Sequence, residues 1–188
     1  LSVMVARRPS GEVVVFPPAQ NWHSRGVLQW SRIPATLPAA VLREAGAHAR
    51  QLADAWRLEG VLAVELFVTT DGALLVNELA PRPHNTFHAT QAACGTDQFE
   101  QLVRAICDLP LGRTDVVTAA ALANLLGDLW TGGPPPFADA LAIPGVSLHL
   151  YGKAARPGRK MGHLLVADPD PDVALRRAQE AFAALERH

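Results

Sequence analysis

The fold is decided by residues 61–79, which read VLAVELFVTTDGALLVNEL. Residues 61–69 form an apolar run that a single acid, Glu65, interrupts, and such a run predicts a buried strand. Asp71-Gly72 is typical of a two-residue hairpin turn, and residues 73–79 follow as the return strand. The stretch therefore predicts an antiparallel hairpin that carries acidic side chains.

The register of this hairpin places two carboxylates opposite each other. Glu65 is expected to face Glu78, and Leu66 is expected to face Asn77. Opposed side chains on one face of a sheet lie about 4.5–5.5 Å apart, and like charges at that distance are destabilising. Such a pair fits an acid dyad that shares a proton, or a site for a divalent cation. Two acids on a solvent-exposed face are the simpler alternative.

The loop after the return strand carries further polar groups. Residues 80–88 read APRPHNTFH, and the two prolines exclude a helix and end the strand. Arg82 offers a planar set of donors for a carboxylate, bicarbonate or phosphate. His84 titrates near neutral pH, and Asn85 both donates and accepts hydrogen bonds. A cation site, an anion receptor and a proton carrier together indicate chemistry on a nucleotide phosphate.

Several short motifs occur in order along the chain. They are PPAQNWH at 17–23, VELF at 64–67, NELAPRPHN at 77–85, DQFE at 97–100, NLLG at 124–127, HLYGK at 149–153 and RPGRKMGH at 156–163. Together they resemble the ATP-grasp superfamily, and within it the N5-carboxyaminoimidazole ribonucleotide synthases, the ATPase subunits of phosphoribosylaminoimidazole carboxylase in purine biosynthesis. The sequence departs from that pattern at Thr86-Phe87, where the family usually has Ser-Gly.

The resemblance implies a reaction and the roles of individual residues. It implies that ATP and Mg²⁺ are used to phosphorylate bicarbonate, and that the resulting carboxyphosphate carboxylates the amine of 5-aminoimidazole ribonucleotide. By the same resemblance, Glu65 and Glu78 hold the metal, and His23, Asn77 and Glu78 contact ATP. The implied catalytic set is Arg82, His84, Asn85, Lys153, Arg159 and Lys160.

Without the resemblance, some of these side chains have simpler interpretations. His23 fits a packed loop histidine, and the basic residues of 153–160 fit a solvated surface. His84 and His88 are four residues apart, which on a helix would suit zinc. The adjacent Pro83 favours a loop instead, and a third soft ligand is not evident.

Composition indicates a cytoplasmic enzyme. Apolar residues make up 49% of the chain and charged residues 19%, with a net charge of −1, which excludes disorder and a surface built to coat nucleic acid. No apolar run approaches the roughly 20 residues of a membrane span, and no signal peptide is visible. Cys94 and Cys107 are too few for a disulfide scaffold and are expected to be small buried residues on helices.

The predicted fold class is α+β. It comprises the second half of an ATP-grasp domain, an antiparallel sheet with flanking helices, over residues 1–112, and a small C-terminal β-rich domain over residues 113–188. The further elements expected are a hairpin within residues 1–16, helices over 38–59, 97–107 and 171–188, a strand over 119–126 and a hairpin over 146–167.

The start of the chain suggests a piece of a longer enzyme. It opens in strand-like alternation without an initiator methionine. The resemblance implies a preceding N-terminal domain and first ATP-grasp subdomain, so we expect a fragment that is inactive alone, taken from an enzyme that forms a homodimer. A formate-dependent glycinamide ribonucleotide transformylase is the enzymatic alternative, although RKMGH at 159–163 argues against it. A non-catalytic folded module is the alternative of another class.

Overall fold

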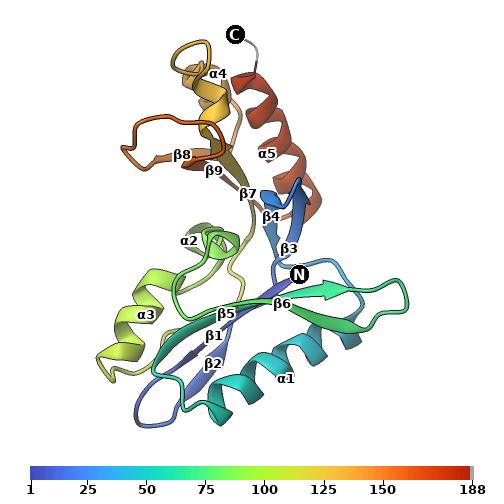
Figure 1. Cartoon of the computed structure of the whole chain (residues 1–188), viewed down its shortest axis with the longest axis vertical. Coiled ribbons are helices and arrows are strands. Elements are labelled where there is room, and N and C mark those ends of the chain that lie inside the picture. Colours follow the sequence, from blue (N-terminus) through green and yellow to red (C-terminus); the bar gives the residue numbers. More distant parts are fainter. Residues whose placement is uncertain (187–188) are drawn as a thin grey trace.

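The computed structural model describes residues 1–186 and contains two antiparallel sheets with helices packed around them (Figure 1). Its strands are β1 (Ser2–Arg7), β2 (Val13–Val15), β3 (Gln20–Ser24), β4 (Val27–Ile33), β5 (Gly60–Val68), β6 (Leu74–Ala80), β7 (Ala119–Leu126), β8 (Val146–Leu150) and β9 (Lys160–Asp168). Its helices are α1 (Ala39–Ala55), α2 (Thr90–Ala93), α3 (Gln98–Ile106), α4 (Phe137–Leu141) and α5 (Pro171–Leu185), with 3-10 turns η1 (Asn85–Phe87) and η2 (Gly127–Trp130). This confirms the α+β class.

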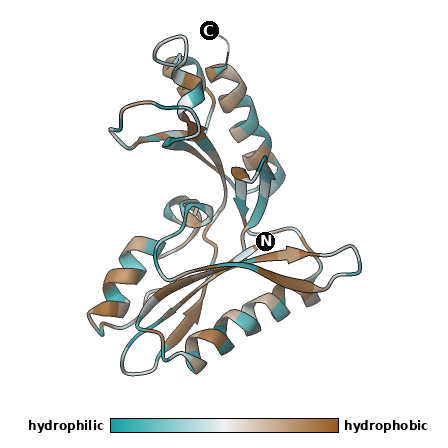
Figure 2. Cartoon of the chain, in the orientation of Figure 1, coloured by the Kyte–Doolittle hydropathy of each residue, from teal (hydrophilic) through white to brown (hydrophobic). Residues whose placement is uncertain are grey.

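The first sheet has the strand order β2-β1-β5-β6. Alternate residues of its inner strands face opposite sides, as the two-residue period of a strand requires. One set, which includes Val3, Val5, Leu62 and Val64, packs on the buried alanines of α1. Figure 2 shows these strands as largely apolar, whereas the turns that join them are pale or polar. The expected N-terminal hairpin is confirmed as β1 and β2.

The second sheet has the strand order β3-β4-β7-β9-β8, and α5 covers one of its faces. The expected strand over 119–126 and the hairpin over 146–167 are confirmed as β7 and as β8–β9. The Asp170 side chain caps α5 by accepting hydrogen bonds from two backbone N–H groups, and Pro171 occupies its first turn. The last two residues of the helix expected over 171–188 lie outside the described residues.

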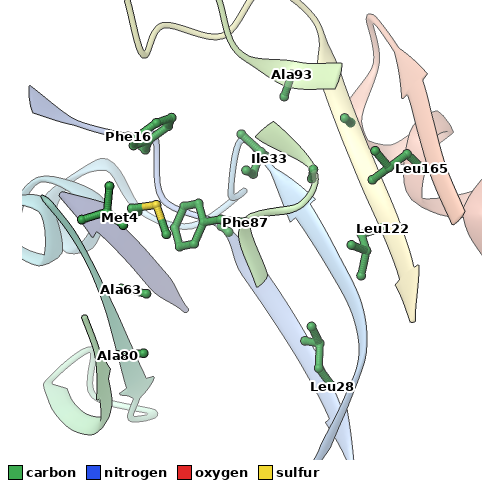
Figure 3. Close-up of a cluster of buried hydrophobic side chains, with 14 of the residues drawn as sticks. Met4, Phe16, Leu28, Ile33, Ala63, Ala80, Phe87, Ala93, Leu122 and Leu165 are labelled. Atoms are coloured by element: carbon green, nitrogen blue, oxygen red, sulfur yellow. The ribbon is translucent and has the colours of Figure 1, made fainter. Parts of the chain in front are cut away.

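A shared core lies between the two sheets (Figure 3). Met4 from the first sheet and Leu122 and Leu165 from the second belong to one buried cluster. Phe87 is fully buried in this cluster, with its ring centroid 6.3 Å from that of Phe16. Phe87 adopts no left-handed backbone conformation, so the phenylalanine fits here without glycine's conformational freedom. It fixes the loop that carries His84 against both sheets.

The hairpin formed by β3 and β4 was not predicted from the sequence. Its two-residue turn is Arg25-Gly26, and both residues have positive φ angles, 50° and 75°. This is the geometry of a type I′ turn, for which glycine is the usual signal. Because β4 pairs with β7, residues 20–33 contribute two strands to the second sheet. The predicted division between residues 112 and 113 remains a prediction.

Two details of the helices differ from expectation. The first helix ends at Ala55 rather than near Glu59, because Arg57 takes a left-handed conformation with φ 47° and closes the helix end. Trp56 consequently points away from the core and is 55% exposed. The helix expected over 97–107 is confirmed as α3, and the Asp97 side chain caps it by accepting from the N–H groups of Phe99 and Glu100.

The cysteine prediction was wrong. Cys94 is half-buried directly after α2, and Cys107 is exposed directly after α3, because both helices end before these residues. Over residues 1–186, no helix has the length and apolar character needed to cross a membrane.

Candidate functional site

Glu65 and Glu78 face each other across the hairpin formed by β5 and β6, as predicted, but the loop and the strand pairing that align them differ from the prediction. The loop contains three residues, 70–72, closed by a hydrogen bond from the Thr69 N–H to the Ala73 carbonyl. Gly72 supplies the positive φ, 87°, that such a loop requires. With this loop alone, Glu65 would face Asn77.

A β-bulge restores the pairing of the two acids. The register shifts by one residue, so that Leu66 pairs with Val76 and Asn77 is the extra residue. The expectation that Leu66 faces Asn77 was therefore wrong. The Asn77 side chain instead donates from Nδ2 to Glu65 Oε2 at 3.3 Å. The bulge thus gathers an amide and two carboxylates at one point of the sheet.

The two carboxylates lie in different environments. The Glu65 side chain is 9% exposed and the Glu78 side chain is 51% exposed. His84 lies between them, with Nδ1 3.5 Å from Glu65 Oε1 and Nε2 3.7 Å from Glu78 Oε1. Carboxylate oxygens are the ligands that Mg²⁺ prefers, so Glu65 and Glu78 fit a shared divalent cation.

The loop between β6 and η1 holds His84 by a network that sequence analysis did not find. Gln98, fully buried at the start of α3, accepts from the His84 backbone N–H at 2.8 Å. The His84 Nδ1 atom lies 3.0 Å from Thr86 Oγ1. The Gln98 amide also contacts His88 Nδ1 at 3.1 Å. Contacts between side chains on separate elements leave no periodic pattern in a sequence.

Burial lowers the pKa of His84, while the nearby carboxylates of Glu65 and then Glu78 raise it in part. The cations Arg82 and Lys160 act in the same direction as burial. For Lys160 itself, desolvation followed by the charge of Arg82 lowers the pKa. Acidic and basic groups therefore face one another across a small space, which suits a site that handles both a cation and an anion.

One cavity of about 490 Å³ brings most of the predicted residues together. A smaller cavity of about 260 Å³ shares His23, Glu65 and Asn77 with it. The predicted residues that line the larger cavity are His23, Glu65, Asn77, Glu78, Arg82, His84, Asn85 and Lys160. The Asn85 Nδ2 atom is buried and has no hydrogen-bond partner within residues 1–186, so it is available to a ligand.

Lys153 and Arg159 do not line this cavity. The Lys153 Nζ atom lies 5.0 Å from the centroid of the Tyr151 ring, and Arg159 donates to the Ala154 carbonyl at 3.1 Å. Both belong to the loop between β8 and β9, whose end reaches the cavity at Gly158 and Lys160. Asp128 secures that loop by accepting from the Gly158 N–H at 2.7 Å.

The cavity also contains residues that sequence analysis did not select. They are Gly26, Val27, Leu28, Phe67, Thr86 and Gly158. Gly26 belongs to the turn between β3 and β4, and Val27 and Leu28 are the first residues of β4. The Arg25-Gly26 pair could have indicated this turn. Among the described residues, no cluster of three or more His, Cys, Asp or Glu side chains could hold a metal, which leaves the zinc alternative without support.

Comparison with known protein families divides the chain into two matched segments. Residues 1–99 match the ATP-grasp domain, and residues 120–177 match the phosphoribosylaminoimidazole carboxylase C-terminal domain. The N5-carboxyaminoimidazole ribonucleotide synthase of Bacillus subtilis (strain 168) is 46% identical over 168 residues, which cover 87% of this chain and 43% of that protein.

Solved structures show the same relationship. The N5-carboxyaminoimidazole ribonucleotide synthetase of Thermus thermophilus matches with a TM-score of 0.86 at 40% identity, over 99% of this chain and 49% of that one. The N5-carboxyaminoimidazole synthase of Aspergillus clavatus, in complex with ADP and 5-aminoimidazole ribonucleotide, matches with a TM-score of 0.89 at 31% identity, over 100% and 51%.

The chain thus spans less than half of the curated B. subtilis relative and about half of each solved chain. The matches confirm the resemblance predicted from the motifs. With its ATP-grasp segment and its phosphoribosylaminoimidazole carboxylase C-terminal segment, the chain belongs to the ATP-grasp family.

Proposed function

We propose that this chain provides the metal-binding and acceptor-binding part of an enzyme that carboxylates 5-aminoimidazole ribonucleotide at the expense of ATP. The observation that carries the proposal is the meeting of two opposed carboxylates with Arg82, His84, Asn85 and Lys160 in one cavity. The similarity to N5-carboxyaminoimidazole ribonucleotide synthases supplies the reaction class.

Glu65 and Glu78 would hold Mg²⁺, which when bound neutralises phosphate charge during phosphoryl transfer. The fit rests on their donor atoms, because hard carboxylate oxygens on opposed strands suit this cation. Asn77 orients Glu65 through its Nδ2 hydrogen bond and lines both cavities, where it would contact the nucleotide. His23 lines both cavities beside this group and is proposed to contact ATP.

The basic half of the cavity would bind the phosphate acceptor. The planar guanidinium of Arg82 and the Lys160 ammonium suit bicarbonate, and the unpartnered Asn85 Nδ2 can donate to it. A bicarbonate oxygen attacks the γ-phosphorus of ATP and ADP leaves, giving carboxyphosphate. The amine of the ribonucleotide then attacks the carboxyl carbon, phosphate leaves and the amine loses a proton.

His84 would stay neutral while it contacts these groups, since burial lowers its pKa. A neutral imidazole can donate to one partner and accept from another, which suits a residue that holds a reactive anion away from bulk water. Lys153 and Arg159 lie on the loop that ends at the cavity, and we assign them to the ribonucleotide phosphate. A homodimer and a cytoplasmic location remain predictions.

A chimera tests the proposal. The chain would replace the matched segment of the B. subtilis synthase, to which it is 46% identical over 168 residues. ADP release is measured with ATP and Mg²⁺, using either bicarbonate with 5-aminoimidazole ribonucleotide or formate with glycinamide ribonucleotide. We expect stimulation by the first pair only.

Two variants of the chimera locate the activity. Glu78→Gln should lower turnover at least 100-fold, because it removes one metal-binding charge without changing the shape of the side chain. Glu59→Gln is the matched control, since Glu59 is exposed just before β5 and lies outside the cavity. Near-normal turnover of Glu78→Gln would contradict the metal assignment, and formate-dependent release would indicate the transformylase. A folded chimera that responds to neither pair would indicate a non-catalytic module.

A further inference from the structure

Three histidines from separate elements form a stack beside the proposed site. The rings of His149 on β8 and His163 on β9 are 4.5 Å apart at 10°, and those of His163 and His88 are 4.6 Å apart at 5°. Phe99 of α3 stacks on His88 at 5.6 Å. We call the four rings of His149, His163, His88 and Phe99 the ring column. It joins the second sheet to the loop and helix that follow the first sheet.

The ring column does not have the geometry of a metal site. Imidazole lone pairs lie in the plane of each ring, so parallel stacked rings cannot direct three nitrogens at one ion. In agreement, residues 1–186 contain no metal-binding cluster of three or more suitable side chains. The function of the ring column must lie in its hydrogen bonds and its contacts.

The central ring, His163, has one satisfied nitrogen and one unsatisfied nitrogen. Its Nδ1 atom lies 2.7 Å from the Tyr151 hydroxyl. Burial raises the pKa of Tyr151 to about 12, so the phenol keeps its proton and can donate it to Nδ1. When the phenol donates to Nδ1, the proton of neutral His163 resides on Nε2, which is buried and has no partner among the described residues. A buried N–H group without an acceptor is costly.

An unsatisfied acceptor lies on the neighbouring strand. Asn124 on β7 pairs directly with His163, so the two side chains occupy the same face of the sheet. The Asn124 Nδ2 atom donates to the Leu28 carbonyl at 3.0 Å, which fixes the orientation of the amide. Its Oδ1 atom is buried and, within residues 1–186, unpartnered. A free donor and a free acceptor are thus neighbours on adjacent strands.

We infer that His163 is a positioning residue whose Nε2–H is joined to Asn124 Oδ1 through one buried water, and whose Nδ1 holds Tyr151. The resulting chain of hydrogen bonds runs from Leu28 of the cavity wall through Asn124 and His163 to Tyr151. On one side it places Tyr151, against whose ring Lys153 lies. On the other side, the His163 ring stacks on that of His88. The Gln98 amide contacts both His88 Nδ1 and the backbone N–H of His84. The consequence for catalysis rests on the proposed function, whereas the hydrogen bonds do not.

Burial and nearby cations disfavour protonation of His163 and His88. Burial is the largest cause that lowers the pKa of His163 to about 3, with His88 and His149 adding to it. Burial also lowers the pKa of His88 to about 4, together with Lys160, His149 and His84. Each of these causes lowers the pKa of the ring on which it acts, so His163 stays neutral at neutral pH.

The first test is the tautomer of His163 in the isolated chain. With ¹⁵N-labelled histidine, two-bond ¹H–¹⁵N spectra distinguish the two neutral tautomers. We expect His163 to carry its proton on Nε2 from pH 7 to pH 5. A proton on Nδ1, or a rapidly exchanging mixture of tautomers, would overturn the assignment.

Asn124→Asp tests the partner. A carboxylate beside Nε2–H should raise the pKa of His163 by at least two units, because it stabilises the imidazolium. Gln91→Glu is the matched control: it adds a carboxylate to the wall of the cavity that His88 and His163 line, but from α2 rather than from β7. A pKa of His163 that moves no more in Asn124→Asp than in Gln91→Glu would contradict the pairing.

Tyr151→Phe is a second variant that tests the proposal if Asn124→Asp does not fold. It is expected to fold, because it removes one partly buried hydroxyl group and keeps the aromatic ring. We expect His163 to keep its proton on Nε2, and the signals of its Nδ1, of His88 and of Lys153 to shift because the Tyr151 hydroxyl is lost. Unchanged spectra would overturn the proposal. In the chimera, the same change should raise the KM for the ribonucleotide several-fold and leave that for ATP within twofold. An inactive chimera would count against the proposed function alone, since the spectra need no substrate.

Discussion

Glu65 and Glu78 are directly opposed on β5 and β6, yet only Glu65 is enclosed by the protein. Asn77 and His84 surround the Glu65 carboxylate, whereas half of the Glu78 side chain reaches solvent. A pair of this kind would hold a divalent cation between Glu65 and Glu78, and the exposed side at Glu78 would leave the cation accessible to phosphate oxygens. The bulge at Asn77 produces this asymmetry, because it turns β6 at the point where the two acids meet.

Mn²⁺, a paramagnetic substitute for Mg²⁺, should bind the isolated chain at this pair. We expect it to broaden the ring signals of His84, which lies within 3.7 Å of both carboxylates, before those of His48 on α1. Glu65→Gln and Glu78→Gln should each weaken the binding at least tenfold, because each removes one of two charged ligands. Titrations followed by NMR line widths measure the effect.

Glu59→Gln is the control for that titration, since it removes an exposed carboxylate outside the cavity and should leave the line widths of His84 unchanged. Equal broadening of His84 and His48 at every Mn²⁺ concentration would show that the ion has no preference for the hairpin. The metal assignment would then be wrong.

Gly127→Ala should displace the loop between β8 and β9. A Cβ atom at residue 127 would lie 2.1 Å from the Arg156 carbonyl oxygen, and backbone cannot yield as a side chain can. The loop would lose the hydrogen bond from the Gly127 N–H to Arg159 and the one from the Gly158 N–H to Asp128. We expect a loss of about 1–3 kcal/mol in the free energy of unfolding. Faster hydrogen exchange of the Gly158 amide would locate the change.

Gly46→Ala is the matched control for the same substitution. Gly46 lies inside α1, and a Cβ atom there would meet nothing closer than 3.9 Å. Alanine should therefore stabilise the chain by about 0.5–1 kcal/mol, because glycine is a poor helix former. If Gly127→Ala proved as stable as the unmodified chain, the close approach of the loop to η2 would be incorrect.

Gln98→Leu should loosen the loop that carries His84. Leucine fills a similar volume, but the His84 backbone N–H and His88 Nδ1 lose the Gln98 amide as their partner. An unsatisfied buried N–H costs about 1–3 kcal/mol, and we expect a loss of that size in urea denaturation. The ring signals of His84 should shift, because the residue is no longer held at the end of β6.

Gln91→Leu makes the same chemical change at an exposed position of α2, where the structure shows no side-chain hydrogen bond for Gln91 among the described residues. It should alter stability by less than about 0.5 kcal/mol. Equal losses from the two substitutions would mean that the contacts of the Gln98 amide do not hold the loop.

Local sequence patterns predicted the Glu65–Glu78 pair but not the reason for it. Asp71-Gly72 indicated a two-residue turn, while the chain uses a three-residue loop and then a bulge at Asn77. The longer loop and the bulge shift the pairing by one residue in opposite directions. The predicted partner of Glu65 is therefore correct, whereas that of Leu66 is wrong. A bulge depends on how the whole strand packs, so no signal within residues 73–79 could specify it.

The assembly of the site depends on contacts between distant residues. His88 and His163 stack although 75 positions separate them in sequence. Similarly, β4 pairs with β7 although α1 and the β5–β6 hairpin lie between them in the sequence. Motifs placed His84, Lys160 and His23 in one functional set, but their spacing could not show that Lys153 and Arg159 lie outside the cavity. Residues with a short-range role, such as the capping Asp97, were predictable because their partners are only two and three positions away.

The stability of the chain should fall as the pH falls from about 6.5 towards 4. Burial lowers the pKa of His88 to about 4 and that of His163 to about 3, whereas histidine in an unfolded chain titrates near 6.5. Between these values the unfolded chain binds protons that the folded chain does not, so low pH favours unfolding. Above about pH 7 both states are neutral and the contribution vanishes. Each histidine binds at most one proton, so it can change the free energy of unfolding by at most about 1.4 kcal/mol per pH unit.

His88→Phe isolates one part of this slope, because phenylalanine can stack between Phe99 and His163 but cannot titrate. Urea denaturation between pH 5 and pH 7 should show that the free energy of unfolding depends less on pH in this variant than in the unmodified chain. The difference should be less than about 1.4 kcal/mol per pH unit, because His88 is only half-buried. An equal slope in His88→Phe and the unmodified chain would mean that folding does not lower the pKa of His88, contrary to the burial of its ring.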